Sequence, residues 1–254
     1  MPGGVLHGTP GFMTAPIYAI GDIHGQHGML EDALARIDSD GGRDATLVFL
    51  GDYIDRGPNS RAVIDTLRSG QREGRNWITL KGNHDRMFQW FMEDTPRHDP
   101  HLLVGFHWFH DRIGGVETMA SYGVTFDERT RLKDIHAHAK AAVPKAHTEF
   151  LDALPLTYET EDLLFVHAGI RPGIPVEQQT EEDLVWIRQS FHNHDGPHPK
   201  LVVHGHTPVQ EATHYGNRIN LDSGAGYGRL LTVAVFEDNK TWVLSESGRQ
   251  PLTI

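Results

Sequence analysis

Short apolar runs alternate with amphipathic stretches over the first third of the chain. The runs IYAI at 17–20 and TLVFL at 46–50 have the length and composition of buried strands. Each is followed by apolar residues at the three- and four-residue spacing of a helix face: first Leu30, Leu34 and Ile37, then Val63, Ile64 and Leu67. A further strand is expected at WITL, 77–80. This order of strand and helix predicts an α/β fold.

The rest of the chain divides into two regions of different character. Residues from about 86 to 158 mix aromatic side chains with the helical segment HAHAKAAVPKAH and show no clear strand, so a largely helical insertion is predicted there. The C-terminal half is rich in strand-like runs: LLFV, LVV, RINL, LLTVAVF and TWVL. Residues 1–16 are rich in Gly and Pro and predict a flexible tail before one domain at 17–254.

Composition excludes several classes of protein. The 254 residues include no cysteine, so disulfides, thiolate metal sites and phosphatase chemistry with a cysteine nucleophile are excluded. The net charge of −11 disfavours a nucleic-acid partner, which needs a basic surface. No apolar run is long enough to span a membrane, and the N-terminus lacks the features of a secretory signal, so we expect a cytoplasmic protein without a membrane partner.

Five of the predicted strands run directly into polar clusters. The clusters are GDIHG at 21–25, GDYIDRG at 51–57, KGNHD at 81–85, HAG at 167–169 and HGHT at 204–207. Taken singly, such a cluster is more often a turn or a helix cap. Loops at the carboxyl ends of strands meet along one edge of an open α/β sheet, so clusters far apart in sequence are expected to converge.

The residues in these clusters predict a metal site. The candidate ligands are Asp22, His24, Asp52, Asn83, His167 and one or both of His204 and His206. Carboxylate, imidazole and amide ligands without sulfur suit manganese, iron or zinc. Six or seven ligands are too many for one tetrahedral ion but suit two ions that share a bridging carboxylate, the arrangement used for in-line phosphoryl displacement.

These motifs resemble the phosphoprotein phosphatases within the calcineurin-like metallophosphoesterases, in particular their small bacterial branch. GDIHG, GDYIDRG, KGNHD, HAG and GHT occur in the family's order, and GGVETMASYG, VWIRQSF and LDSGAGYG extend the resemblance over nearly all of 17–236. The resemblance implies a metallophosphoesterase sandwich, in which two mixed β-sheets are flanked by helices.

The resemblance also assigns the metal ligands. It implies that Asp22 and His24 bind the first ion, that Asp52 bridges, and that the second ion is held by Asn83, His167 and His206. His206 is chosen over His204 because the family's ligand is the histidine of a Gly-His pair. Manganese is the expected metal of both sites, with iron or zinc as alternatives.

Four further residues are implied to act on the substrate. His84 corresponds to the family's general acid, which protonates the leaving oxygen, and Asp55 to the aspartate that orients it and favours its charged form. Arg56 and Arg188 correspond to arginines that bind the phosphate, because a planar guanidinium matches phosphate oxygens with paired hydrogen bonds. For Arg188, an arginine on an amphipathic helix that is merely solvated is the alternative.

The expected activity is hydrolysis of phosphomonoesters, with phosphoserine, phosphothreonine or phosphotyrosine proteins as substrates and attack by water held between the metals. A symmetrical diadenosine tetraphosphate hydrolase is one alternative. The chain departs from that pattern by keeping Asp55 and by placing Thr207 after Gly-His. The other alternative is a catalytically silent metal-binding module, which would have lost ligands, whereas none is missing here.

Overall fold

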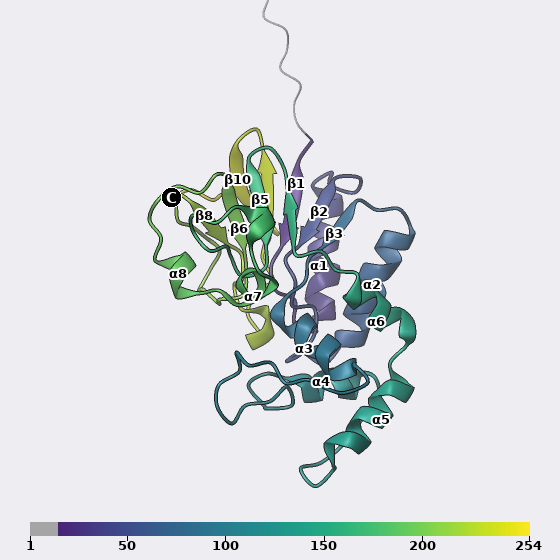
Figure 1. The fold of residues 1–254 in the computed structure, drawn as a ribbon. Helices are drawn as coiled ribbons and strands as arrows, with labels where there is room; N and C mark the ends of the chain where they lie inside the picture. Colours follow the sequence, from purple (N-terminus) through teal and green to yellow (C-terminus); the bar gives the residue numbers. More distant parts are fainter. Residues whose placement is uncertain (1–14) are drawn as a thin grey trace, which may run out of the picture.

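Two mixed β-sheets pack face to face in the computed structural model, which describes residues 15–254 (Figure 1). The first sheet has the order β11-β10-β9-β1-β2-β3, with β1 (Ile17–Ile20), β2 (Thr46–Phe49), β3 (Trp77–Thr79), β9 (Val233–Glu237), β10 (Lys240–Ser245) and β11 (Gly248–Pro251). The second has the order β4-β5-β6-β8-β7, with β4 (Thr157–Glu159), β5 (Leu163–Val166), β6 (Leu201–His204), β7 (Thr213–His214) and β8 (Arg218–Asn220). The predicted sandwich of two mixed sheets is confirmed.

The alternation of side chains along each strand explains why both faces of the first sheet are apolar. In β1, Ala19 points into the layer between the sheets, whereas Tyr18 and Ile20 belong to the core on the other face. The layer between the sheets is built from both of them, and its members include Val48, Leu50, Phe165, Val203 and Ile219. A strand that is buried on both faces reads as a continuous apolar run, which is the pattern seen in the sequence.

Helices cover the outer face of the first sheet. They are α1 (His27–Ser39), α2 (Ser60–Arg72) and α3 (Asn83–Met92). The predicted helix faces are buried in this core, namely Leu30 and Ile37 of α1 with Val63, Ile64 and Leu67 of α2. Leu34 is only partly buried, at the edge of the same cluster.

The middle of the chain is helical in the structure. After α3 come α4 (Gly115–Ser121), α5 (Leu132–Ala142) and α6 (Lys145–Asp152), with irregular loops between them (Figure 1). α6 contacts α3, which ties this region to the rest of the fold. The division into a tail and one domain stays a prediction, and residues 1–14 of the predicted tail lie outside the described residues.

The segment around VWIRQSF differs from the amphipathic helix considered for Arg188, because α7 (Glu181–Trp186) ends before Arg188 and α8 (Gln189–His192) begins after it. In the loop that follows, His192 and His198 pack against buried Phe191. Two short 3₁₀ turns complete the fold, η1 (Val176–Gln178) and η2 (Ala225–Tyr227). No helix among residues 15–254 is long and apolar enough to cross a membrane.

Candidate metal centre and active site

The predicted polar clusters occupy the loops at the carboxyl ends of parallel strands in both sheets. β1, β2 and β3 run parallel to one another, as do β5, β6 and β8, and each ends at one of the loops that form the site. The two sets of loops meet along one edge of the sandwich. Convergence of the clusters, expected from the sequence, is therefore a feature of this fold.

The backbone of these loops is in an unusual conformation. Among the described non-glycine residues with positive φ, five belong to the predicted site: His24 (48°), Asp52 (52°), Asp55 (71°), Arg56 (65°) and His206 (67°). Such angles cost energy for residues with a Cβ and persist only where the surrounding structure enforces them. Their concentration in one place marks the strand-end loops as the functional region.

Asp52 lies at the centre of the cluster. Its carboxylate belongs to two groups of potential metal ligands, one with His24 and His84 and the other with His167 and His206, and within each group the ligand atoms lie within 4.8 Å of one another. Asp52 Oδ2 is 3.5 Å from His24 Nε2, and Asp52 Oδ1 is 3.5 Å from His167 Nε2. A single carboxylate that faces both groups lies where a ligand that bridges two ions would have to lie.

Asp22 and Asn83 complete the predicted ligand set. The Asp22 carboxylate accepts the backbone N–H of His206, at 3.1 Å to Oδ2. Asn83 Oδ1 lies 3.0 Å from His167 Nε2 and 2.8 Å from His206 Nδ1. The backbone at Gly205 lies so close to the Asp22 carboxylate that only glycine fits, because a Cβ on Gly205 would overlap Asp22 Oδ1.

Backbone carbonyls orient two of the histidines. His24 Nδ1 donates to Ile54 O at 2.9 Å, and His167 Nδ1 donates to Leu50 O at 2.8 Å. A hydrogen bond at Nδ1 fixes the tautomer and leaves Nε2 with its lone pair directed at the cluster. Burial lowers the pKa of both rings, which favours the neutral form that binds metals.

The donor set fits divalent cations. Asp22, Asp52 and Asp222 are buried together, and burial with the charges of Asp222 and Asp52 raises the pKa of Asp22. Like charges at such proximity are stabilised by a cation between them. The ligands offer carboxylate oxygen, amide oxygen and imidazole nitrogen, the combination that binds manganese, iron or zinc.

His84 and Asp55 form a buried hydrogen-bonded pair beside this cluster. His84 Nδ1 is 2.6 Å from Asp55 Oδ2, and the His84 backbone N–H donates to Asp52 Oδ1 at 2.9 Å. Burial raises the pKa of Asp55 to about 7 and lowers that of His84 to about 3. Burial thus disfavours the imidazolium expected from the sequence. A single proton shared by the pair lies between His84 Nδ1 and Asp55 Oδ2, so acid catalysis by His84 requires a second proton on Nε2.

Two arginines reach the cluster, Arg56 from the loop that follows β2 and Arg188 from the connection between β5 and β6. Arg56 Nη1 donates to His24 Nε2 at 2.6 Å and Nη2 to His84 Nε2 at 3.2 Å, and its guanidinium lies 4.7 Å from the ring centroid of Tyr227. Arg188, in the break between α7 and α8, donates from Nε to His206 Nε2 at 3.0 Å. Arg188 is an exposed residue, but it lies outside any helix and its guanidinium contacts the site rather than solvent alone.

His204 lies outside the cluster. Its Nε2 accepts from Arg218 Nη1 at 3.2 Å, and its ring packs against Phe191 at a centroid distance of 5.1 Å. The structure thus separates the two histidines of HGHT: His206 faces the candidate metal centre, whereas His204 packs behind it. All the other predicted site residues are joined to the cluster by the contacts above.

Sequence reasoning missed several residues that support the site. Asp85 accepts the backbone N–H groups of Asp52, Tyr53 and Gly82 at 2.8, 3.1 and 2.9 Å and so holds two strand-end loops together. Asp55 is held by Thr118 and Trp108 from the middle region. Asp85 belongs to the motif KGNHD and Thr118 to GGVETMASYG, so both lie in segments on which the family resemblance rests. Only the structure shows which groups they contact.

A family model for calcineurin-like phosphoesterases matches residues 15–233. The chain belongs to this family. Among its relatives, serine/threonine-protein phosphatase 1 of Salmonella typhimurium is 27% identical over 224 residues, covering 86% of this chain and 90% of that protein. The asymmetrical bis(5′-nucleosyl)-tetraphosphatase PrpE of Anoxybacillus flavithermus is 26% identical over 212 residues, covering 77% of each chain.

A solved structure shows the same fold at lower identity. The cold-active protein-tyrosine phosphatase of a psychrophilic Shewanella species is 17% identical, with a TM-score of 0.61, over 94% of this chain and 80% of that one. The sequence prediction of a calcineurin-like hydrolase that acts on phosphate esters is confirmed. The relatives differ in the substrates they are named for, so membership of the calcineurin-like phosphoesterases does not select one.

Proposed function

We propose that this calcineurin-like phosphoesterase hydrolyses phosphomonoesters, with phosphoserine and phosphothreonine proteins as its principal substrates and phosphotyrosine as a further class. The observation that carries the proposal is the 2.6 Å contact between His84 Nδ1 and Asp55 Oδ2, at a position where neither residue is exposed. A seryl or threonyl oxygen leaves as a strongly basic alkoxide and needs a proton. A nucleoside polyphosphate is a better leaving group and depends less on this pair.

The candidate ligands divide between two divalent ions. Asp22, His24 and Asp52 would hold one, and Asp52, Asn83, His167 and His206 the other, with manganese as the proposed metal. Bound ions of this kind lower the pKa of a coordinated water and neutralise charge on phosphate oxygens. The oxygen and imidazole donors described above support this assignment.

The remaining site residues act on the substrate in this proposal. The guanidinium groups of Arg56 and Arg188 bind the phosphate oxygens and orient the ester. In its imidazolium form His84 donates the Nε2 proton to the leaving oxygen, while the Asp55 carboxylate accepts from Nδ1 and stabilises that charged form. Trp108 and Thr118 in turn hold Asp55.

A tetraphosphatase is the second candidate, and the similarity to PrpE favours it. The test is kcat/KM for a phosphoserine peptide and for diadenosine tetraphosphate under identical manganese concentrations. We expect the phosphopeptide to be the better substrate. A preference of about tenfold for the dinucleotide, which is about 1.4 kcal/mol of transition-state discrimination, would reject the proposal. If neither compound nor an aryl phosphate is turned over, the chain is a silent binding module instead.

A further inference from the structure

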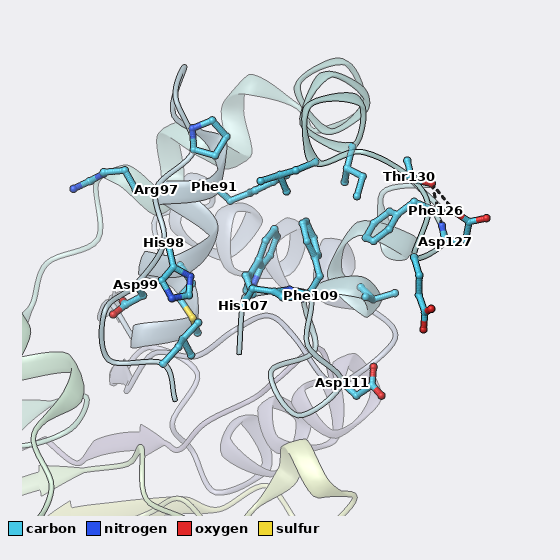
Figure 2. A pocket seen from close by; sticks show the side chains of 18 residues that line it. Phe91, Arg97, His98, Asp99, His107, Phe109, Asp111, Phe126, Asp127 and Thr130 are labelled. Atoms are coloured by element: carbon cyan, nitrogen blue, oxygen red, sulfur yellow. Dashed lines mark hydrogen bonds between the residues drawn. The ribbon is translucent and has the colours of Figure 1, made fainter. Parts of the chain in front are cut away.

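A cavity lies in the middle region, outside the candidate metal centre. Its volume is about 640 Å³, within the usual range for small-molecule sites. Figure 2 shows the rings of Phe91 and Phe109, with Phe126 across from them, around the same space. Trp108 and the exposed Leu132 add to the lining. The cavity thus offers an apolar, mainly aromatic surface to a ligand.

The charged residues of this cavity are predominantly acidic. Asp111, Asp127 and Glu128 lie on its lining, and none of them forms an ion pair within residues 15–254. Figure 2 places Asp111 and Asp127 at one end of the cavity. Hydrogen bonds from Thr130 and the backbone N–H of Arg129 lower the pKa of Asp127, so this carboxylate stays charged.

Two other charged side chains on the lining, Arg97 and Asp99, already have partners of opposite charge. Arg97 forms a two-point ion pair with Glu93 and lies over the ring of Trp90, 4.1 Å from its centroid. Asp99 is buried and accepts two hydrogen bonds from Arg86, at 3.1 and 2.8 Å. Among the described residues, three carboxylates on the lining thus have no ion-pair partner whereas its one arginine has, so the charges on the lining favour a cation over a phosphate group.

The walls of the cavity are connected to the candidate active site at two points. Trp108 is one of the residues that line the cavity, and it donates from Nε1 to Asp55 Oδ2 at 2.8 Å. Asp99 accepts from Trp186 Nε1 at 3.1 Å, and the ring of Trp186 packs edge-on against His206 at a centroid distance of 5.6 Å. A ligand in the cavity would thus contact Trp108, which donates to Asp55, and Asp99, which is connected to His206 through Trp186.

We propose that this cavity binds a small amphipathic cation, an ammonium group carried on an aromatic or branched apolar body, and that the bound ligand holds Trp108 in place against Asp55. The apolar body fills the space between the aromatic rings, and the ammonium group faces the acidic end. Aromatic faces attract cations as well, which adds to the charge complementarity. The proposal does not depend on which phosphate ester the enzyme hydrolyses.

Binding is tested with phenethylamine as the probe, by titration calorimetry on the metal-loaded protein. We expect a Kd of about 1 mM or tighter, which is reasonable for a ligand of this size. Phenylacetate has the same ring with the opposite charge, and propylamine has the charge without the ring, so both should bind at least about tenfold more weakly. Equal affinity for phenylacetate, or no binding of phenethylamine, would overturn the proposal.

The site of binding is tested by charge reversal. Asp111→Lys combined with Glu128→Lys should weaken phenethylamine binding by about tenfold or more, because both carboxylates then repel the probe. The matched control is Glu161→Lys combined with Glu246→Lys, which makes the same change in net charge at exposed turns of the β4–β5 and β10–β11 connections. Equal weakening in both double variants would place the probe elsewhere.

Coupling to the active site is tested with Trp108→Phe, which keeps an aromatic ring but removes the indole N–H. Saturating phenethylamine should raise kcat of the unmodified enzyme by about twofold to fivefold, at or below the lower end of usual coupling, on whichever of the phosphoserine peptide and diadenosine tetraphosphate it turns over faster. The variant should still bind the probe but show no such rise. No response in the unmodified enzyme, or an equal response in the variant, would contradict the role assigned to Trp108.

Discussion

Asp55 accepts hydrogen bonds on a single carboxylate oxygen, Oδ2, from both His84 Nδ1 at 2.6 Å and Trp108 Nε1 at 2.8 Å. Its other oxygen accepts from Thr118 at 2.7 Å. The residue is fully buried, so these donors replace the water that the carboxylate loses on folding. Two of the three donors come from the middle region of the chain, which therefore helps to position the proposed general acid.

Replacing His84 tests its role in protonating the leaving group. His84→Asn should lower kcat on a phosphoserine peptide by about 10²–10⁴, the usual range for loss of acid catalysis, with metal content unchanged. The loss should be smaller for an aryl phosphate, because a phenolate leaves with less protonation. Equal losses on the alkyl and the aryl ester would remove His84 from this role.

Thr118 should contribute mainly to stability. Thr118→Val keeps the shape of the side chain but removes the hydroxyl that donates to Asp55 Oδ1 and accepts from the Asp55 backbone N–H at 2.8 Å. We expect the free energy of unfolding to fall by about 1–3 kcal/mol, the cost of leaving buried polar groups without partners. Chemical denaturation measures it.

The matched control for this variant is Thr148→Val. Its hydroxyl donates to the backbone carbonyl of Lys145 at the surface of α6, where water can replace it. A change of under about 0.5 kcal/mol is expected there. If both variants lose the same stability, the hydrogen bonds to Asp55 add nothing beyond an ordinary surface contact.

His147 should make stability depend on pH without touching the metal site. Its ring is 2% exposed and connects Tyr122 OH at Nδ1 with Asp65 Oδ1 at Nε2, each at 2.9 Å. Burial lowers the pKa of His147 below its usual 6.5. The unfolded chain therefore binds the proton first as pH falls, so this contribution is present above about pH 6.5 and is lost below it.

The measurement is the free energy of unfolding at several values between about pH 7.5 and 5. His147→Gln keeps a donor and an acceptor but cannot titrate, so its stability should fall less steeply with acidification, by up to about 1.4 kcal/mol per pH unit for one proton. Other buried histidines contribute equally to both proteins and cancel in the comparison. Parallel curves for the two proteins would contradict the assignment.

The fold and the location of the site could be predicted because both depend on local sequence patterns. Apolar runs that end in polar clusters give the strands and their loops, and the rule for carboxyl ends of parallel strands brings the loops together. The strands LLFV, LVV and RINL appear as β5, β6 and β8 for this reason. The short strands β4, β7 and β11 carry little periodicity of their own and form through pairing with neighbours.

The support of the site could not be predicted, because it depends on contacts between distant segments. Trp108 lies 53 residues from Asp55 in the sequence, and no spacing rule connects them. The left-handed backbone of His24 and Asp52 is likewise enforced by the assembled loops rather than by residue type. For Arg188, the motif suggested a helix, whereas the structure places the residue in a break that directs it to His206.

Metal dependence follows from the buried carboxylates. Chelation should abolish turnover, and manganese should restore it better than other divalent ions. Asp52→Asn should remove most of the activity, because Asp52 faces both groups of ligands. Full turnover in chelated and dialysed protein would show that the proposed metals take no part.

The number of metal ions bound per chain decides whether the cluster around Asp52 is a two-metal centre. Two ions are expected there, with His206 facing the cluster and His204 behind it in contact with Arg218. Elemental analysis after loading with manganese should give about two ions per chain for the unmodified protein and for His204→Gln, and about one for His206→Gln. One ion or none in the unmodified protein, or loss of an ion from His204→Gln with two retained in His206→Gln, would contradict this assignment.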